Sequence, residues 1–486
     1  MNAFVNGIGH KISAPSAQIV TTDNGAKSYA STMNACLDFF RRAGSARGQT
    51  LNADFDRAYQ EDADLAIRGL LWLRDIRGGA GEREAFRKIM IHMSKHEKYA
   101  SLLSKLIELT PEYGRFDDLM IYDSGFARER ALEVFANAIK NQNGLAAKWA
   151  PREKSKKVSD RRFAVDLANK LGLNPKQYRK TIVELTKVVE TQMCAKKWDD
   201  INYSHVPSVA TRRYTKAFYK HDATRYAQFV ADAANGKVKV NASAIFPHDI
   251  IQESAIYDIG GTTETLADAQ WQAMPNFMNG RRILPVIDTS SSMTSHVPGT
   301  RISHMHIAIT LGMYVAEKNI GAFNNVFLTF NDFPTLERIH SNHSIFRRYR
   351  EVKGSNWGGS TNFQKSFDLI LNHAVKNSVP QDQMPEIIIV VSDMQFNQAG
   401  NLTNYQAIRQ KYEDAGYKIP QIVFWQLNGS KRDAQARHDT VGVSMISGFS
   451  PAVLKGVLSG DLNVEETSPM QTMLDTLMVD RYNWNK

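Results

Sequence analysis

Two carboxylates and three hydroxyls follow strand-like segments in the C-terminal half of the chain. Asp288, Ser290 and Ser292 come directly after an apolar run, Asp393 ends another, and Thr361 follows two glycines before a helical pattern. All five are hard oxygen donors, which suit Mg²⁺ or another small divalent cation that keeps several of its waters. We therefore predict a divalent-metal site formed by Asp288, Ser290, Ser292, Thr361 and Asp393.

Each part of this pattern has a simpler interpretation when taken alone. A serine-rich turn is usually a helix cap, and an aspartate at the end of a strand is often a loop former. Their coincidence in three successive elements favours the metal site. A catalytic site is less favoured, because the chain has neither a G-x-S-x-G elbow nor a phosphate loop. His296 lies four residues past Ser292, but a single nearby histidine is more often a surface or cap residue. We predict binding, and no enzymatic activity.

The elements that must position these residues are strands. Near-continuous apolar runs of strand length occupy residues 282–288, 326–330, 386–392 and 421–425. Helical patterns lie between them, and strands that alternate with helices predict a mostly parallel, doubly wound sheet. Ligands of such sheets bind beyond the carboxyl ends of the strands, which is where Asp288 and Asp393 fall. We place the domain boundary near residue 281, giving an α/β domain over residues 281–486.

The order of these motifs resembles a known arrangement. D-x-S-x-S after the first strand, a later threonine after glycines, and an aspartate ending a central strand are similar to the metal-ion-dependent adhesion site of von Willebrand factor A domains, which have a Rossmann-like fold. The resemblance implies that Ser290 and Ser292 bind the metal directly, Thr361 directly or through water, and Asp288 and Asp393 mainly through waters. An open coordination position would then accept a carboxylate or phosphate from a partner.

Residues 1–280 have a helical rather than a strand-like apolar periodicity. The first thirty or so residues are polar and aperiodic, and are expected to form an arm or a loosely packed start. Apolar residues then recur at helical spacing. The sets are Leu102, Leu106 and Leu109; Leu132, Phe135 and Ile139; and Ile182, Leu185, Val189 and Met193. Thr110-Pro111 and Asn174-Pro175 predict new helix starts. Such short helices must stack as a bundle or as a solenoid of helix pairs.

Composition limits the class of protein. A chain of 486 residues that is 43% hydrophobic and 23% charged is expected to form two folded domains. No apolar run approaches the roughly 20 residues of a membrane span, and the N-terminus has no signal-peptide pattern. Cys36 and Cys194 form neither a disulfide framework nor a cysteine metal site, which fits a reducing cytoplasm.

The net charge of +10 is unevenly distributed. Residues 148–239 hold 21 basic and 9 acidic residues, whereas residues 251–280 hold four acids and no base. Such an excess suits a polyanion-binding surface, although a well-solvated surface of a basic protein would look the same. The candidate RNA-binding residues, chosen on charge, are Lys148, Arg152, Lys156, Lys157, Arg161, Arg162, Arg212 and Arg213. The glycine-rich loop at residues 74–83 could hold phosphate, or could be an inter-helix turn with paired charges.

Four stretches of the helical part resemble an uncharacterised family of plants and large viruses in which helices precede a von Willebrand A part. They are residues 74–79, 111–119, 147–152 and 194–208. The arrangement is also similar to the Ro autoantigen and its bacterial relatives, whose TROVE module is a ring of HEAT-like helical repeats closed by such a domain. That resemblance implies a basic ring through which single-stranded RNA ends pass, with structured RNA on the outer surface.

The leading hypothesis is a cytoplasmic, non-enzymatic protein that binds noncoding or single-stranded RNA, and so forms a ribonucleoprotein, with Mg²⁺ or another divalent cation in its A domain. A second hypothesis is an adhesion scaffold of a viral or chaperone assembly whose metal captures an acidic residue of a protein partner. A third is a metal-dependent nuclease.

Overall fold

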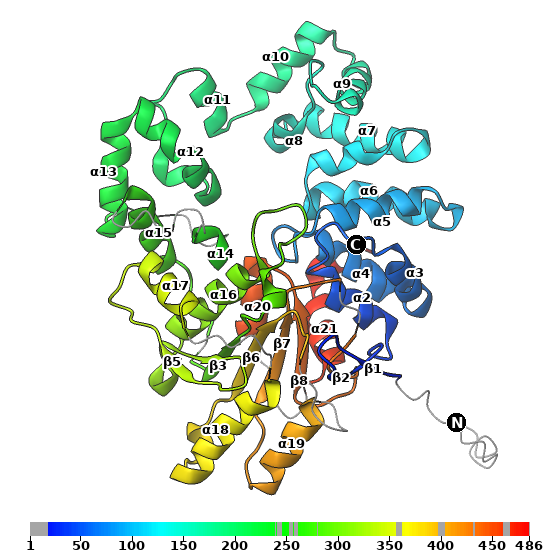
Figure 1. The fold of residues 1–486 in the computed structure, drawn as a ribbon. Helices are drawn as coiled ribbons and strands as arrows, with labels where there is room; N and C mark the ends of the chain where they lie inside the picture. The colour runs from blue at the N-terminus through cyan, green and yellow to red at the C-terminus, as the bar shows by residue number, and fades with distance from the viewer. Residues whose placement is uncertain are drawn as a thin grey trace, which may run out of the picture.

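The protein consists of a helical arc and a sheet with helices around it (Figure 1). The computed structural model describes residues 18–238, 240, 245–251, 256, 261–278, 280–355, 362–396, 404–430, 433–459 and 467–485. Among these residues, no helix is long and apolar enough to cross a membrane. Both cysteines are free, Cys36 buried and Cys194 exposed. The predicted order of a helical part followed by an α/β part is confirmed.

The arc begins with a short hairpin and continues through helices of mostly three turns or fewer. The hairpin strands are β1 (Ile19–Thr21) and β2 (Lys27–Tyr29). The first helices are α2 (Ala35–Ala43), α3 (Asn52–Glu61), α4 (Ala63–Arg74), α5 (Glu84–Ser94), α6 (Ala100–Tyr113), α7 (Gly125–Lys140) and α8 (Gly144–Trp149). The remaining helices are α9 (Val158–Leu171), α10 (Pro175–Leu185), α11 (Val189–Cys194), α12 (Ser208–His221), α13 (Ala223–Ala234), α14 (Pro247–Ile250) and α15 (Thr262–Gln272).

The sheet has six strands, in the order β5-β4-β3-β6-β7-β8. They are β3 (Ile283–Ile287), β4 (Val326–Thr329), β5 (Leu336–Arg338), β6 (Ile387–Ser392), β7 (Gln421–Gln426) and β8 (Val443–Ser447). All neighbours pair in parallel except β5, which runs antiparallel at one edge. The four predicted strands are present. The two edge strands were not predicted, because β5 is short and half-exposed and β8 is interrupted by serines.

Helices cover both faces of the sheet, as its apolar strands require. The helices of this part are α16 (His304–Lys318), α17 (Ile345–Lys353), which packs on α16, α18 (Phe363–Asn377), α19 (Asn404–Asp414), α20 (Pro451–Ser459) and α21 (Pro469–Leu477). Gly312 of α16 lies directly on Ile287 of β3. Phe363 of α18 packs on Phe424 of β7, with ring centroids 5.6 Å apart. The register aligns Ile287 with Trp425, the neighbour of Phe424, so these two helices lie on opposite faces.

The arc starts and ends on the sheet part, so the chain follows a closed path (Figure 1). At its start, Tyr29 and Ala434 exchange backbone hydrogen bonds of 2.8 and 2.7 Å. At its end, the indole N–H of Trp271 donates to Glu317 of α16 at 2.9 Å. The expectation of a loosely packed start is therefore wrong for the hairpin, whose partner lies some 400 residues away in sequence. Residues 1–17 lie outside the described part.

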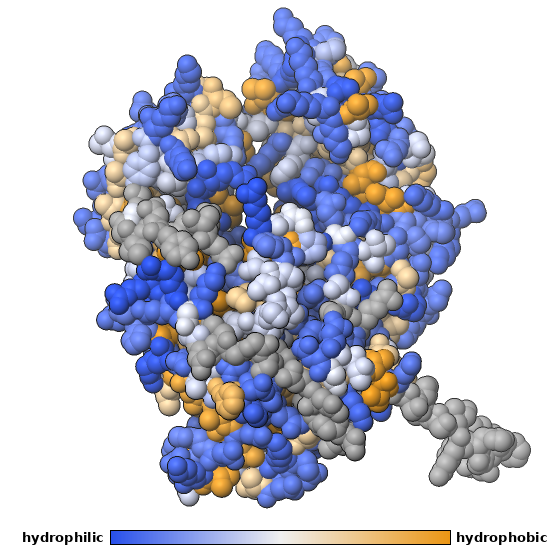
Figure 2. All heavy atoms as spheres, viewed as in Figure 1, coloured by the Kyte–Doolittle hydropathy of each residue, from blue (hydrophilic) through white to orange (hydrophobic). Residues whose placement is uncertain are grey.

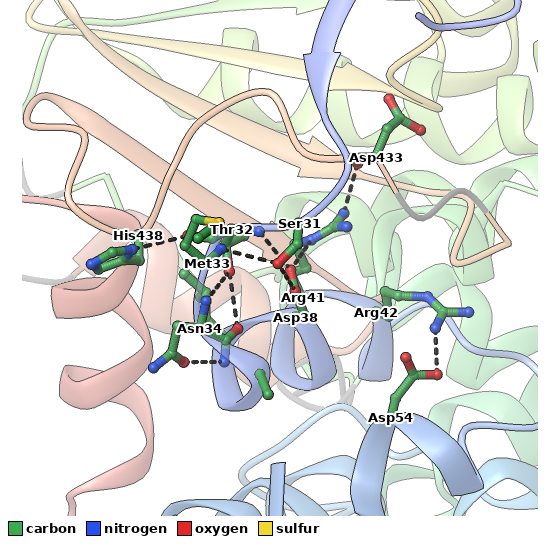
Figure 3. A network of polar contacts seen from close by, with 12 residues as sticks. Ser31, Thr32, Met33, Asn34, Asp38, Arg41, Arg42, Asp54, Asp433 and His438 are labelled. Atoms are coloured by element: carbon green, nitrogen blue, oxygen red, sulfur yellow. Dashed lines mark hydrogen bonds and ion pairs between the residues drawn. The ribbon is translucent and has the colours of Figure 1, made fainter. Parts of the chain in front are cut away.

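Buried charge reinforces the first of these junctions (Figure 3). A guanidinium nitrogen of Arg41 donates to the carbonyl of Asp433 at 2.9 Å, and its Nε lies 3.5 Å from Asp38. The Nδ1 of His438 lies 2.9 Å from the carbonyl oxygen of Thr32. Since Arg41 is almost completely buried, removing the Asp38 carboxylate would weaken the compensation of a buried charge.

Two helix boundaries differ from the predictions. Helix α6 does not end before Pro111 but runs through it to Tyr113, so no new helix starts there. The apolar set that begins at Ile182 is divided between two helices, because α10 ends at Leu185 and α11 begins at Val189. The Asn174-Pro175 start is confirmed, and Asn174 forms a capping box with Gln177.

Candidate functional site

Asp288 and Asp393 lie beyond the carboxyl ends of the two central strands. Strand β3 pairs with β6 in a register that aligns Ile287 with Val391. The sheet continues from β3 to β4 on one side and from β6 to β7 on the other, so the strand order reverses between β3 and β6. This reversal is where open α/β sheets bind ligands.

Local hydrogen bonds fix the loop after β3. The Oδ1 of Asp288 accepts from the backbone N–H of Ser290 at 2.9 Å, and its Oδ2 accepts from the hydroxyl of Ser392 at 2.5 Å. The hydroxyl oxygens of Ser290 and Ser292 lie 3.0 Å apart. Asp288 is fully buried, whereas Ser292 is exposed. Oxygen donors therefore extend from the sheet core to the surface.

The electrostatics of the site favour a bound cation. Burial, followed by the charge of Asp393, raises the pKa of Asp288 to about 6, and hydrogen bonds from Ser392 and Ser290 only partly offset this. Nearby, the hydroxyl of Thr289 is buried without a hydrogen-bond partner among the described residues. Two repelling buried carboxylates with adjacent hydroxyls fit a hard divalent ion such as Mg²⁺.

The structure brings four of the five predicted metal residues to one edge of the sheet: Asp288, Ser290, Ser292 and Asp393. Thr361 lies outside the described residues. Ser392 was missed by the sequence prediction, although a serine at the end of an otherwise apolar strand was a signal for it. His296 is exposed and forms an isolated backbone bridge with Ser303.

The predicted RNA-binding residues lie on α8, on the loop to α9, on α9 and on α12. Within the described part of the chain, Lys148, Arg152, Lys156 and Arg162 are exposed and have no ion pair. Lys157 lies 3.5 Å from Asp160. The remaining three are Arg161, Arg212 and Arg213.

These three arginines differ in accessibility. Arg161 is half-buried and donates to backbone carbonyls, including that of Ser155 at 2.8 Å. Arg212 is only 13% exposed and lies 4.0 Å from Asp249 of α14, so it is poorly placed to contact a polyanion. Arg213, on the next position of α12, is exposed.

A groove of about 1000 Å³ separates α8 and α10 from α11 and α12. Its lining includes Lys148, Lys187, Lys197 and Arg213. Figure 2 shows a mainly hydrophilic surface over this part of the arc, hollowed between the α12 side and the α8 side. Three acids also line the groove, and one of them, Glu190, accepts a hydrogen bond from Tyr214 at 3.0 Å.

Trp149, which follows Lys148 in the basic part of the arc, already contacts two cations of the protein. The guanidinium of Arg115 lies 3.9 Å from the centroid of the Trp149 ring, and the ammonium of Lys148 lies 5.7 Å from it. A guanidinium on a tryptophan face is a favourable cation–π contact. One face of Trp149 is thus used inside the protein, which leaves it less available for stacking on a base.

The glycine-rich loop at residues 74–83 is a structural junction, which favours the inter-helix turn over the phosphate loop. Buried Arg74 pairs with Asp118 at 2.7 Å. Asp75 accepts from both Arg481 and Tyr482, so the loop holds the C-terminal end of the chain. The charges of the loop are therefore largely used within the protein.

The fold and the site together define a helical arc closed by an α/β part with oxygen donors at its strand-order reversal. Residues 282–481 match a family described as a domain of unknown function (DUF7788), and residues 22–110 and 166–280 match another such family (DUF2828). The chain is 29% identical over 518 aligned positions to an uncharacterized protein of Acanthamoeba polyphaga mimivirus, covering 95% of this chain and 87% of that protein. It is also similar to the crystal structure of the Deinococcus radiodurans RO (RSR) protein, with 14% identity and a TM-score of 0.47, covering 87% of this chain and all of that one.

Proposed function

We propose that this chain is a non-enzymatic RNA-binding protein that holds single-stranded or noncoding RNA on the basic surface of its arc. The observation that carries the proposal is the set of exposed cations around α8, α9 and α12, several of which have no ion pair within the described residues. Cations without internal partners are available to neutralise phosphates. In this proposal the arc is a TROVE-like repeat domain and the sheet part is a von Willebrand A domain.

The shape of the groove supports RNA over a purely solvated basic surface. A groove of about 1000 Å³ lined by four cations and three acids keeps a small positive excess and can follow a single-stranded backbone, whereas a convex charged face offers isolated contacts. Residues 148–239 hold 21 basic and 9 acidic residues, and this excess gives that part of the arc a preference for polyanions.

A salt titration tests the proposal. If the exposed Lys148, Arg152, Lys156, Arg162 and Arg213 each contact one phosphate of a single strand, the log–log salt slope is about −3.5, which is roughly a 100-fold loss of affinity between 50 and 200 mM salt. Combining Lys148→Glu, Arg152→Glu and Arg162→Glu should weaken binding strongly and reduce the slope by about 2. The matched control reverses three exposed cations of the sheet part, Arg301→Glu, Lys376→Glu and Lys418→Glu, and should leave the slope unchanged.

The outcomes of this titration distinguish RNA binding from nuclease activity. Binding with a steep salt slope that is unaffected by EDTA supports RNA binding on the arc. Lack of measurable affinity at 50 mM salt, or equal losses in the test and control variants, rejects it. Mg²⁺-dependent cleavage of the RNA that disappears with Asp393→Ala would instead identify a nuclease.

A second function is favoured by the repelling carboxylates at the strand-order reversal. We propose that Asp288, Ser290, Ser292 and Asp393, with Thr361, hold Mg²⁺ or another divalent cation. The cation would neutralise the charge of the two aspartates, and an open position would bind a carboxylate of a protein partner. Calorimetric titration with Mg²⁺ tests this, because Asp288→Ala and Asp393→Ala should each abolish binding. Unchanged Mg²⁺ affinity in both variants rejects the site.

A further inference from the structure

A second cluster of potential metal ligands lies on α17 and on the turn between β5 and α17, apart from the site at the strand-order reversal. His340 and His343 stand at the two ends of a turn in which the N–H of His343 donates to the carbonyl of His340 at 3.0 Å. Glu351 lies in the second half of α17, eight residues after His343. The turn and the helix together bring two imidazoles to one carboxylate.

The distances in this cluster approach those of a coordination sphere. The Nδ1 of His343 lies 2.8 Å from Oε1 of Glu351, and the Nδ1 of His340 lies 3.4 Å from Oε2. All three potential ligand atoms lie within 4.8 Å of one another. Zinc–ligand bonds of about 2.0–2.2 Å at tetrahedral angles place the ligand atoms roughly 3.4 Å apart. Small side-chain rotations would therefore let a single ion contact all three.

The backbone that carries the cluster is held from the other side of α17. The N–H of Ile345 donates to Asp268 of α15 at 2.9 Å. The hydroxyl of Tyr349 lies 2.8 Å from Nδ1 of the buried His306 of α16. Because the inner face of the helix is fixed by these contacts, the turn and Glu351 are held in place before a ligand binds, which reduces the entropic cost of forming a site.

One neighbouring cation competes for the carboxylate. The Nε of Arg347 lies 3.1 Å from Oε1 of Glu351. Burial raises the pKa of Glu351, but hydrogen bonds from His343 and Arg347 outweigh burial and leave that pKa below its usual value, so the ligand is ionised at neutral pH. The Arg347 side chain is 56% exposed and can move into solvent when a metal displaces it.

We propose that His340, His343 and Glu351 form a binding site for Zn²⁺ or a similar transition-metal cation, with water completing the coordination. Two imidazole nitrogens and one carboxylate are a ligand set that zinc accepts and Mg²⁺ does not prefer. This site is thus chemically distinct from the oxygen-only site at the strand-order reversal. Its metal would fasten the β5–α17 turn at the side where the arc returns to the sheet.

Zinc titration of the full chain against a chromophoric chelator tests the proposal. Excess Mg²⁺ occupies the oxygen-only site, and a Cys194→Ser background removes the exposed thiol as an alternative ligand. We expect one zinc equivalent to bind, and either His343→Gln or Glu351→Gln to lower the affinity at least about tenfold. The control His373→Gln, an exposed histidine on α18, should not change it.

A variant that is expected to bind zinc more tightly shows that a loss of affinity in the other variants does not come from misfolding. Arg347→Met removes the competing guanidinium and should raise the zinc affinity and the zinc-dependent increase in Tm. The proposal is overturned if the wild-type chain takes up no zinc under these conditions. It is also overturned if the zinc stoichiometry of Glu351→Gln equals that of the wild type, or if Arg347→Met weakens binding. None of these results depends on RNA affinity, and the affinity changes of Glu351→Gln and Arg347→Met report on this cluster alone.

Discussion

Replacing Asp288 by asparagine should stabilise the metal-free protein while it destroys the metal site. At neutral pH the buried carboxylate is ionised although burial and Asp393 oppose its charge, so the folded state carries a penalty that asparagine removes. The two side chains have nearly the same shape. An uncharged amide at this position also retains an oxygen that can accept from the N–H of Ser290.

The magnitude follows from the pKa. A rise from 3.8 to about 6 is roughly two pKa units, or about 3 kcal/mol at 1.36 kcal/mol per unit. The hydrogen bond from Ser392 to the carboxylate is lost or weakened, which reduces the expected gain to about 1–3 kcal/mol. Because the folded-state pKa is the higher one, the contribution of Asp288 to stability is complete below about pH 4. It is lost as the pH rises through 6.

Urea unfolding followed by tryptophan fluorescence measures this effect. In EDTA at pH 7.5, Asp288→Asn should be more stable than the wild type, and the difference should disappear near pH 4. With Mg²⁺ at 100 times its dissociation constant, the wild type should gain about 2.7 kcal/mol and the variant nothing. The exposed control Asp382→Asn should behave as the wild type in both conditions. The reasoning is refuted if Asp288→Asn is less stable than the wild type in EDTA, or if it retains the gain from Mg²⁺.

Two other perturbations test the junctions between arc and sheet. Burial lowers the pKa of His248 to about 4, so the unfolded chain binds more protons than the folded chain between pH 4 and 6.5. As the pH falls through that window, up to about 3 kcal/mol of stability should be lost. His248→Phe should flatten this part of the stability profile measured by urea unfolding. A Cβ at Gly44 would lie 2.1 Å from the carbonyl oxygen of Ser447 at the end of β8, so Gly44→Ala should cost more than about 2 kcal/mol in urea unfolding. Gly456→Ala in α20, where a Cβ meets nothing within 4 Å, should be neutral or stabilising, and equal losses in the two glycine variants would contradict the packing argument.

Local sequence patterns were sufficient to predict the central strands and the position of the oxygen donors at their ends. The apolar runs before Asp288 and Asp393 predicted strands, and the rule for parallel sheets placed both carboxylates at one edge. The register of β3 and β6 then brought them close enough for the charge of Asp393 to raise the pKa of Asp288. The helical periodicity around Leu132 and the cap at Asn174 were likewise local features, and they appear in α7 and α10.

Charge alone was a weaker guide to which residues are available to a partner. Arg212 and Arg213 are neighbours in the sequence, yet one lies against Asp249 and the other is exposed. A helix turns about 100° per residue, so adjacent side chains face different surroundings. Whether a basic residue is buried depends on the element packed against that face, and α14 is separated from α12 by 25 residues.

The sequence by itself thus determined the order of helices and strands and the chemistry of the donors at the strand ends, because these depend on residues close together in the chain. Only the tertiary structure decided that the hairpin pairs with Ala434, that Asp75 holds Arg481, and that Trp271 of α15 donates to Glu317 of α16. Contacts between residues distant in sequence are selected by packing and by compensation of buried charge, and short-range patterns carry no information about which distant partner will supply them.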